Sequence, residues 1–427
     1  MTTLQQMSRD ALRQCELELT AQHTTLRGRN RKIDMTRGKP SAAQLDLSNG
    51  LFNTVTDDSF LGADDEEYRN YGAQSGIREA NDFFAECLGV PAKSLFIGGN
   101  SSLQLMYDTL SRAMLFRVPG GEVPWRDVEG ISFICPIPGY DRHFAVCETL
   151  GIKMITVDLR DDGPDMDAVE RLVADDPAIK GIWCVPKYSN PSGIVYSPEV
   201  TARLAGMATA VPDFHIMWDN AYTFHHFDGD LAEIDNILEV ARVAGNPDRP
   251  LMFASTSKVT FPGAGIAVVA GSDRNMADIV RHSAIGTIGH DKLNQLRHVR
   301  FFNDAKGLTD HMAKHGDLLR PKFRAVDQAM ENSLAGTGIA DWDTPKGGYF
   351  VSVDLLDGCA TETVALADQT GVKLTPAGAG HPYGKDPHDR TLRLAPTYPT
   401  LGDVEGAMEV FCVSAELACI RKLLSET

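Results

Sequence analysis

The sequence has little of what would assign it to a special class of protein. Aromatic side chains make up 7% of its 427 residues, and none of its cysteines form a C-x-x-C pair. No apolar run approaches the roughly 20 residues that a membrane-spanning helix needs. There is no internal repeat, low-complexity segment or Gly/Ser-rich linker. The hydrophobic (43%) and charged (23%) fractions are those of an ordinary globular protein and exclude collagen-like and mainly disordered classes.

Length and charge narrow the possibilities further. At about 150 residues per domain, the chain predicts two or three domains. Lys and Arg number 41 against 58 Asp and Glu, a net charge of −17. Such a field repels nucleic acids and anionic membranes, so neither is an expected partner. An anionic ligand would have to be held by a few local cations.

The eight cysteines lie mostly in apolar runs, such as residues 131–136 and 410–419. This pattern favours reduced core thiols of a cytosolic protein over a disulfide framework. The first twenty residues read as a polar amphipathic helix and lack the apolar core of a signal peptide. We therefore expect a cytoplasmic protein.

From about residue 76, short apolar runs alternate with helical periodicity, which is typical of an α/β fold with a parallel sheet. Seven runs predict a large, mostly parallel, seven-stranded sheet with helices on both faces: residues 94–97, 131–135, 153–157, 181–185, 215–218, 251–254 and 266–270. Ser197 followed by Pro198 marks one helix start. After about residue 290, long helices, strand-like residues 348–353 and 391–394 and a final helix over 401–425 predict a second, smaller α/β domain.

A lysine lies at the end of one predicted strand. Lys258 closes the segment Ser255-Thr256-Ser257-Lys258, directly after the run 251–254. Partial desolvation there would favour its neutral amine, which can form a Schiff base. Ser255 and Ser257 could bind a phosphate. The tetrapeptide alone fits a surface lysine in a polar loop equally well.

Three other strand ends carry polar or aromatic side chains at the edge where α/β folds bind ligands. Asp219 follows the run 215–218 and can keep a heterocyclic nitrogen protonated, although helix N-cap aspartates are common at such junctions. Asn190 follows the run 181–185, where a simple Asn-Pro turn is the alternative. Tyr140 and His143 follow the run 131–135 and offer an aromatic ring and an imidazole.

A glycine-rich turn precedes a predicted helix over 101–115. Its residues Gly98, Gly99, Asn100, Ser101 and Ser102 would point free N–H groups and the helix dipole toward an anion. The turn is a weak signal alone. Together with Ser255 and Ser257 it predicts a phosphate site.

Along nearly the whole chain, and in the family's order, these motifs resemble those of the fold-type I, class I aminotransferases, which use pyridoxal 5′-phosphate. The segment Thr36-Arg37-Gly38-Lys39-Pro40-Ser41 is similar to that of a bacterial aspartate aminotransferase subgroup. The resemblance implies an N-terminal arm (1–47) that contributes to the small domain, a large cofactor-binding domain (48–305) and a small C-terminal domain (306–427).

The resemblance also implies roles for the site residues. Lys258 would carry the cofactor and move the substrate proton, Asp219 would pair with the pyridinium nitrogen, and Tyr140 would stack on the ring. The remaining implied cofactor and substrate contacts are His143 behind Asp219, Asn190 and Tyr222 at the cofactor O3′, Gly99, Asn100, Ser101, Ser102, Ser255 and Ser257 at the phosphate, Tyr71 from the partner of a homodimer, and Gly38, Asn190 and Arg393 at the substrate. Arg393 would grip the α-carboxylate through two parallel hydrogen bonds.

Two cations that the resemblance leads us to expect are not identified in the sequence. Family members usually carry a phosphate-binding arginine about eight residues after the lysine, but residues 259–266 contain no cation. A dicarboxylic substrate also needs a second cation, for which Lys39, Arg37, Lys292 and Arg297 are candidates.

The favoured reaction transfers the amino group between L-aspartate and 2-oxoglutarate. An alanine or broad-specificity aminotransferase and a carbon–sulfur lyase stay open as alternatives, whereas a DNA-binding regulator is disfavoured by the net charge. We expect no metal site, because His311 and His315, spaced i, i+4, lack a third ligand.

Overall fold

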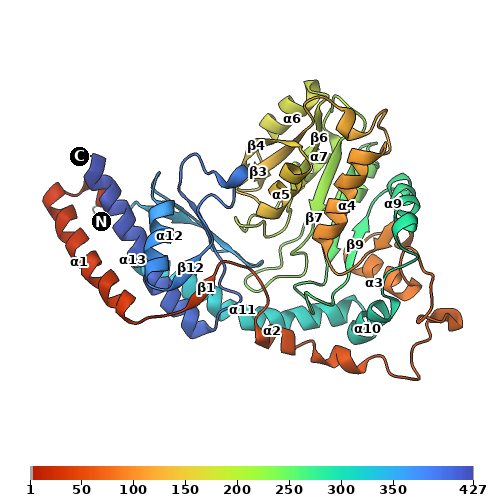
Figure 1. Ribbon diagram of the computed structural model, residues 1–427, viewed down its shortest axis with the longest axis horizontal. Helices are drawn as coiled ribbons and strands as arrows, with labels where there is room; N and C mark the ends of the chain where they lie inside the picture. Colours follow the sequence, from red (N-terminus) through yellow and green to blue (C-terminus); the bar gives the residue numbers. More distant parts are fainter. Residues whose placement is uncertain (1–2, 427) are drawn as a thin grey trace.

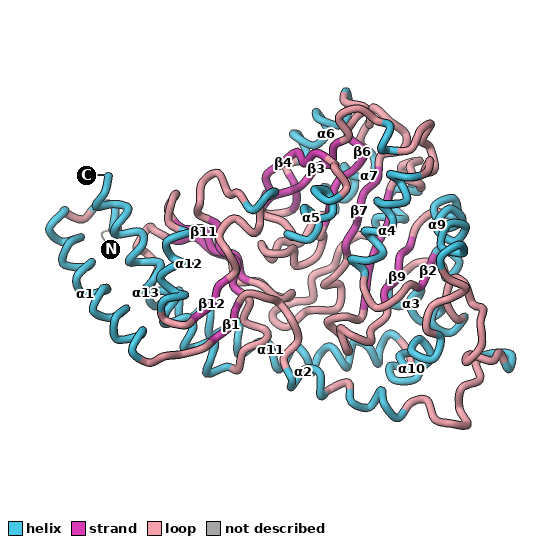
Figure 2. The backbone as a smooth tube through the Cα atoms, in the orientation of Figure 1, coloured by secondary structure: helices cyan, strands magenta, loops and turns pink. Residues whose placement is uncertain are grey.

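A computed structural model describes residues 3–426, apart from the side chain of residue 64. Its dominant feature is an eight-stranded sheet (Figures 1 and 2). In spatial order the strands are β2 (Leu95–Ile97), β9 (Ala267–Ala270), β8 (Pro250–Ser255), β7 (His215–Asp219), β6 (Ile179–Cys184), β3 (Ser132–Ile137), β4 (Lys153–Arg160) and β5 (Gly163–Pro164).

The central strands of this sheet are parallel. β8, β7, β6, β3 and β4 run in one direction, whereas β9 is antiparallel to both of its neighbours. All seven predicted runs form strands, which confirms the predicted α/β class. The eighth strand, β5, has two residues and pairs antiparallel with the edge strand β4. It is too short to leave a hydrophobic signal in the sequence.

Helices cover both faces of the sheet, because alternate strand residues point to opposite sides. In β7, for example, Met217 lies in one core whereas Ile216 and Trp218 lie in the other. The first core contains side chains of α4 (Ser102–Leu115), α5 (Asp141–Thr149) and α9 (Asp273–Gly286). The second contains side chains of α3 (Arg78–Leu88), α6 (Met166–Asp175), α7 (Pro198–Gly206), α8 (Ile237–Val243) and α10 (Lys292–Phe302).

A smaller group of elements lies to one side of the large sheet (Figure 1). It contains an antiparallel sheet of β10 (Ala340–Trp342), β11 (Val351–Leu355) and β13 (Thr391–Leu394), and a parallel pair of β1 (Ile33–Met35) and β12 (Val372–Leu374). The long helix α13 (Leu401–Glu426) packs against α1 (Arg9–Gly28) and α12 (Ala360–Gln369). The N-terminal helix and strand therefore join the C-terminal part of the chain.

One helix belongs to both groups. In α11 (Ala305–Ser333), Leu308 and Met312 lie in the core of the large sheet, whereas Leu319 and Phe323 lie in the core of the smaller group. The short helix α2 (Ala42–Asp46) packs against α11. We propose on these contacts that the domains divide near residues 47 and 305. Within residues 3–426, no helix is long and apolar enough to cross a bilayer.

Candidate active site

A cavity of about 170 Å³ lies at the carboxyl ends of the parallel strands. Asp219 ends β7 and Ser255 ends β8, and α4 begins at the same edge. Nine residues singled out from the sequence line it: Ser101, Ser102, Tyr140, Asn190, Asp219, Tyr222, Ser255, Ser257 and Lys258. They meet because parallel strands place all their carboxyl ends at one edge.

The side chain of Lys258 is partly buried and lines this cavity. Its Nζ lies 4.8 Å from the ring centre of Tyr222 and 5.8 Å from that of Tyr349. Burial lowers the pKa of Lys258, while the charge of Asp219 acts in the opposite direction. The amine is thereby shifted toward its neutral, nucleophilic form.

Asp219 presents one paired and one unpaired oxygen. Its Oδ2 accepts a hydrogen bond of 3.0 Å from Nε2 of His143, whose ring stacks on Trp183 at 4.1 Å. Its Oδ1 is buried and has no hydrogen-bond partner within the described part of the chain. A buried carboxylate oxygen without a partner is costly. It therefore suits a ligand that brings an N–H group.

Two tyrosines beside Asp219 stay protonated. Burial and the charge of Asp219 raise the pKa of Tyr140 to about 12. Burial also raises the pKa of Tyr222 well above its usual value. Both phenols can therefore donate hydrogen bonds at neutral pH, and Tyr140 adds a ring face beside His143.

The start of α4 and the turn before Lys258 form one polar cluster. Ser101 caps α4, and its Oγ accepts from the N–H of Gln104 at 3.3 Å. Ser257 Oγ donates to the carbonyl of Asn100 at 2.9 Å, and Ser255 Oγ donates to Ser257 Oγ at 3.1 Å. N–H groups at the start of α4 and serine hydroxyls thus lie close together, an arrangement typical of anion-binding sites.

Two further hydrogen bonds hold the glycine-rich turn of residues 98–102. The Gly99 carbonyl accepts from the N–H of Ala267 at 2.7 Å, and Asn100 Nδ2 donates to the carbonyl of Pro262 at 2.9 Å. The position eight residues after Lys258 is Ile266, which is buried. Of the described residues that line the cavity, Lys258 is the sole cation. The helix terminus and hydroxyls must therefore provide the anion contacts on this side of the cavity.

Arg393 of β13 reaches the site from the smaller group of elements. Its Nη1 donates to Asp141 Oδ1 and to Asn190 Oδ1, both at 3.2 Å. Its guanidinium lies 4.9 Å from the ring centre of Phe350. Its Nε is buried and makes no hydrogen bond to any described residue. One edge of the guanidinium is thus anchored, and an N–H on the other is free for a carboxylate.

Sequence reasoning missed Asp141 and Phe350. Asp141 reads as an ordinary acidic residue in a helix's first turn, and only the packing of β13 beside α5 brings it to Arg393. Gly38 lies against Phe350, since a Cβ added at Gly38 would come within 2.4 Å of Phe350 Cζ. Glycine at that position permits the N-terminal segment to approach Phe350, whose ring packs on Arg393.

Other predicted residues lie away from the cavity. Tyr71 is 82% exposed on a surface loop. Lys292 donates to the carbonyls of Asn70 and Gly72 in that loop. Arg37 and Lys39 are exposed, and Lys39 Nζ lies 3.8 Å from the ring centre of Tyr398.

Arg297, His311 and His315 do not line the cavity either. Arg297 has a buried Nε without a partner among the described residues. His311 and His315 belong to a hydrogen-bonded network, and no group of three metal-ligating side chains occurs in the described residues.

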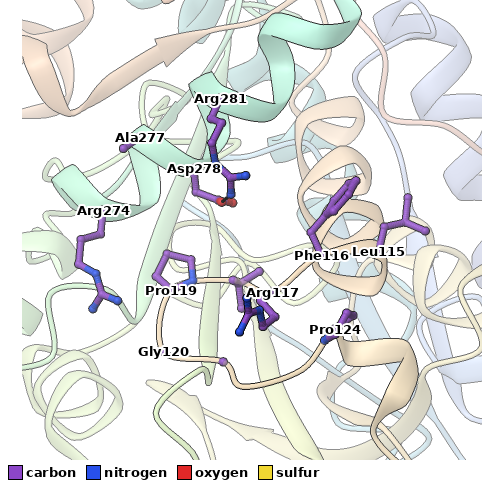
Figure 3. A pocket seen from close by; sticks show the side chains of 12 residues that line it. Leu115, Phe116, Arg117, Pro119, Gly120, Pro124, Arg274, Ala277, Asp278 and Arg281 are labelled. Carbon is purple, nitrogen blue, oxygen red and sulfur yellow. Dashed lines mark hydrogen bonds and ion pairs between the residues drawn. The ribbon is translucent and has the colours of Figure 1, made fainter.

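A larger cavity, of about 790 Å³, lies between residues 115–124 and α9 (Figure 3). Three arginines line it, but Arg281 is paired with Asp278 at 2.5 Å and Arg274 with Asp248 at 2.6 Å. The described residues that line it include no lysine, histidine or cysteine. We therefore place the chemistry in the smaller cavity at the strand ends.

Comparison with known proteins gives one consistent answer. The family described as aspartate amino-transferase matches residues 7–427. A Mycolicibacterium smegmatis protein named as an aminotransferase, with no substrate specified, is 46% identical over 98% of both chains. An aspartate aminotransferase of Corynebacterium glutamicum is 42% identical over 90% of this chain and 89% of its own. The crystal structure of an aspartate transaminase from the same organism superposes with a TM-score of 0.96 at 40% identity, covering 99% of both chains.

Proposed function

The chain belongs to the aspartate aminotransferase family, and on this premise we propose that it transfers the amino group of L-aspartate to 2-oxoglutarate, using pyridoxal 5′-phosphate. The products would be oxaloacetate and L-glutamate. The observation that carries the proposal is that a desolvated lysine, Lys258, lies in the same cavity as a carboxylate oxygen of Asp219 that is buried and has no partner among the described residues. Both face one cavity.

The residues present fit this cofactor. When bound, pyridoxal phosphate supplies an electron-accepting ring that stabilises negative charge at the substrate Cα. Asp219 Oδ1 would accept from the protonated ring nitrogen, with His143 holding the other oxygen. Ser255, Ser257 and the start of α4 would bind the phosphate, and the ring of Tyr140 would stack on the cofactor.

Lys258 would transfer the substrate proton. Its Nζ would first hold the cofactor and, once the substrate amine has displaced it, would act as the base beside the substrate Cα. The neutral form favoured by burial can accept the Cα proton and deliver it to carbon C4′ of the cofactor. A 2-oxo acid would then reverse the sequence, which gives ping-pong kinetics.

Arg393 would orient the substrate. Asp141 and Asn190 hold its Nη1, which leaves the Nε edge for the α-carboxylate. A planar guanidinium that binds a carboxylate through two hydrogen bonds fixes the direction of the Cα–H bond. The closely related aspartate aminotransferase of C. glutamicum supports aspartate as the amino donor.

We also propose a homodimer in which each subunit lends Tyr71 to the other's phosphate site. Tyr71 is exposed and is not among the residues that line its own chain's cavity, which supports this arrangement. Lys292, which is bonded to the carbonyls of the same loop, is then the best-placed candidate for the second cation that a dicarboxylic substrate needs.

A panel of single-turnover half-reactions on the purified holoenzyme tests the proposal. L-Aspartate and L-glutamate should react fastest, with L-alanine and L-cysteine at least about tenfold slower. A fastest reaction with alanine would overturn the aspartate assignment, and release of pyruvate and ammonia would indicate a lyase.

Two lysine variants complete the test. Lys258→Ala should lose the visible absorbance of the bound cofactor and all transamination. Lys187→Ala is the control, because Lys187 is a buried lysine that bonds to the carbonyl of Thr223 outside the cavity.

A further inference from the structure

The backbone that follows Lys258 is held by an unusual number of side chains. The Lys258 carbonyl accepts hydrogen bonds from Tyr349 Oη and His225 Nε2, both at 3.3 Å. The next carbonyl, of Val259, accepts from His311 Nε2 at 2.9 Å and from Ser48 Oγ at 3.5 Å. The four donors come from four separate segments of the chain.

Gln44 of α2 connects these donors to the N-terminal segment. Its Nε2 donates to Tyr349 Oη at 3.0 Å and lies 3.2 Å from Nδ1 of His315. His315 in turn lies 3.1 Å from His311. Gln44 Oε1 accepts from the N–H of Ser41, three residues after Gly38. A continuous set of polar contacts therefore runs from the segment beside the substrate arginine to the lysine.

The network is buried, and its members do not line the cavity. Gln44 and Ser48 are fully buried, and Tyr349 and His315 are each 1% exposed. None of the four is among the residues that line the cavity. Buried polar groups that lose a partner are destabilising, so the network holds one arrangement of the Lys258 peptide.

That arrangement matters because the lysine side chain pivots on this peptide. The Nζ must reach two atoms in turn, one on the cofactor and one on the substrate. A misplacement of about 1 Å in a reacting group can reduce a rate by about 100-fold. The ring of Tyr349 also faces the side chain, and its centre lies 5.8 Å from Nζ.

We propose that Tyr349, supported by Gln44, is a positioning residue that sets the orientation of Lys258 and links it to the N-terminal segment. The inference rests on the proposed function of Lys258. Tyr349→Phe keeps the ring but leaves His225 as the one described donor to the Lys258 carbonyl. Gln44→Met removes the amide behind Tyr349 at similar volume.

The experiment compares two forms of the cofactor added to apoenzyme. Pyridoxal 5′-phosphate must react with Lys258 to give the visible band, whereas pyridoxamine 5′-phosphate binds without that reaction. For Tyr349→Phe we expect the visible band to form at least about tenfold more slowly, with the dissociation constant of pyridoxamine 5′-phosphate within about threefold of wild type. The kcat should fall similarly, with KM nearly unchanged.

Control variants separate positioning from folding. Tyr188→Phe is a matched loss of one buried hydroxyl, which bonds His226 at 2.5 Å, and should form the band at the wild-type rate. Gln44→Met should show a smaller slowing, and the double variant should be no slower than Tyr349→Phe alone, because both act through one contact.

Three results would be decisive against the inference. They are a wild-type rate for both single variants, an equal loss of pyridoxamine 5′-phosphate binding, or a Tyr188→Phe variant as slow as Tyr349→Phe. If wild-type apoenzyme itself formed no visible band, the proposed function would fail instead. Should Tyr349→Phe not fold, the same comparison on Gln44→Met decides the matter.

Discussion

At the scale of single residues, the two carboxylate oxygens of Asp219 have different surroundings. One of its oxygens is held by His143, which is itself fixed by stacking on Trp183. The other oxygen is buried without a partner in the described chain. The cost of that unsatisfied oxygen is relieved if the ligand brings a proton on nitrogen.

The first prediction concerns the charge of Asp219. Asp219→Asn should leave a folded protein whose half-reaction rates fall by roughly 100-fold or more, because a neutral amide cannot sustain a positive ring nitrogen. Stopped-flow absorbance measures this directly. Asp213→Asn is the control: Asp213 is equally buried but bonds Lys180 and Trp125, each at 2.9 Å. Near-normal rates in Asp219→Asn would contradict the pyridinium role.

Sequence reasoning reached the residues at strand ends and, through the family resemblance, His143 behind Asp219, but it missed several residues that hold the site from farther away. Lys258, Asp219 and Asn190 each follow an apolar run, which is a local signal. Asp141, Gln44 and Tyr349 contact the site through partners 91 to 305 positions away. No local pattern encodes such contacts, because they depend on how the helices and sheets pack.

At the scale of elements, the N-terminal segment is fastened at both sides of Gly38. Thr375 Oγ1 donates to the carbonyl of Thr36 at 3.0 Å, and Thr397 Oγ1 donates to the carbonyl of Lys39 at 3.1 Å. Gly38 itself lies under the ring of Phe350, which packs on Arg393. This short segment therefore packs, through Phe350, against Arg393, the arginine proposed to bind the substrate.

A second prediction follows from that close approach. Gly38→Ala must displace Phe350 and should raise KM for every amino acid and 2-oxo acid by about tenfold, with a stability loss of roughly 1–3 kcal/mol. Steady-state kinetics and denaturant unfolding measure the two effects. Gly28→Ala is the control, since a Cβ at Gly28, the last residue of α1, would meet no atom within 4 Å. An unchanged KM in Gly38→Ala would show that Phe350 does not support Arg393.

At the scale of the whole molecule, a chain with net charge −17 offers anions a cavity edged by a helix terminus, Lys258 and Arg393. The remaining cations must come from elsewhere. In the proposed dimer the partner subunit's Lys292 would supply one of them, and the partner's Tyr71 would add a hydroxyl group.

Subunit mixing tests that arrangement. Tyr71→Phe and Lys258→Ala chains, each impaired alone, should recover activity when unfolded and refolded together. Mixed dimers then hold one site with an intact lysine and an intact tyrosine, so about a quarter of wild-type activity is expected if assembly is random and Tyr71→Phe is nearly inactive. Activity no greater than the average of the separate variants would show that Tyr71 does not act across subunits.

The last prediction concerns acid stability. Burial lowers the pKa of His225 and His315 to about 3 and that of His298 to about 4. Between those values and about 6.5 the unfolded chain binds more protons, so stability falls as pH drops through this window, by up to about 1.4 kcal/mol per pH unit for each histidine. The melting temperature should be nearly constant from pH 7 to 8 and fall steeply from 6.5 to 5. His298→Gln should make that fall shallower, and a flat profile in the wild type would contradict the assignment.

The sequence by itself determined the layered α/β fold, the seven main strands and the residues at their carboxyl ends, because hydrophobic periodicity and turn chemistry act over a few neighbouring residues. Tertiary structure alone decided which edge of Arg393 is free, what holds the Lys258 peptide and where Tyr71 lies. Arg393 meets Asp141 across 252 positions, and Gln44 meets Tyr349 across 305. Contacts of that range exist only after two separate groups of elements have packed together, so their geometry is a property of the folded chain.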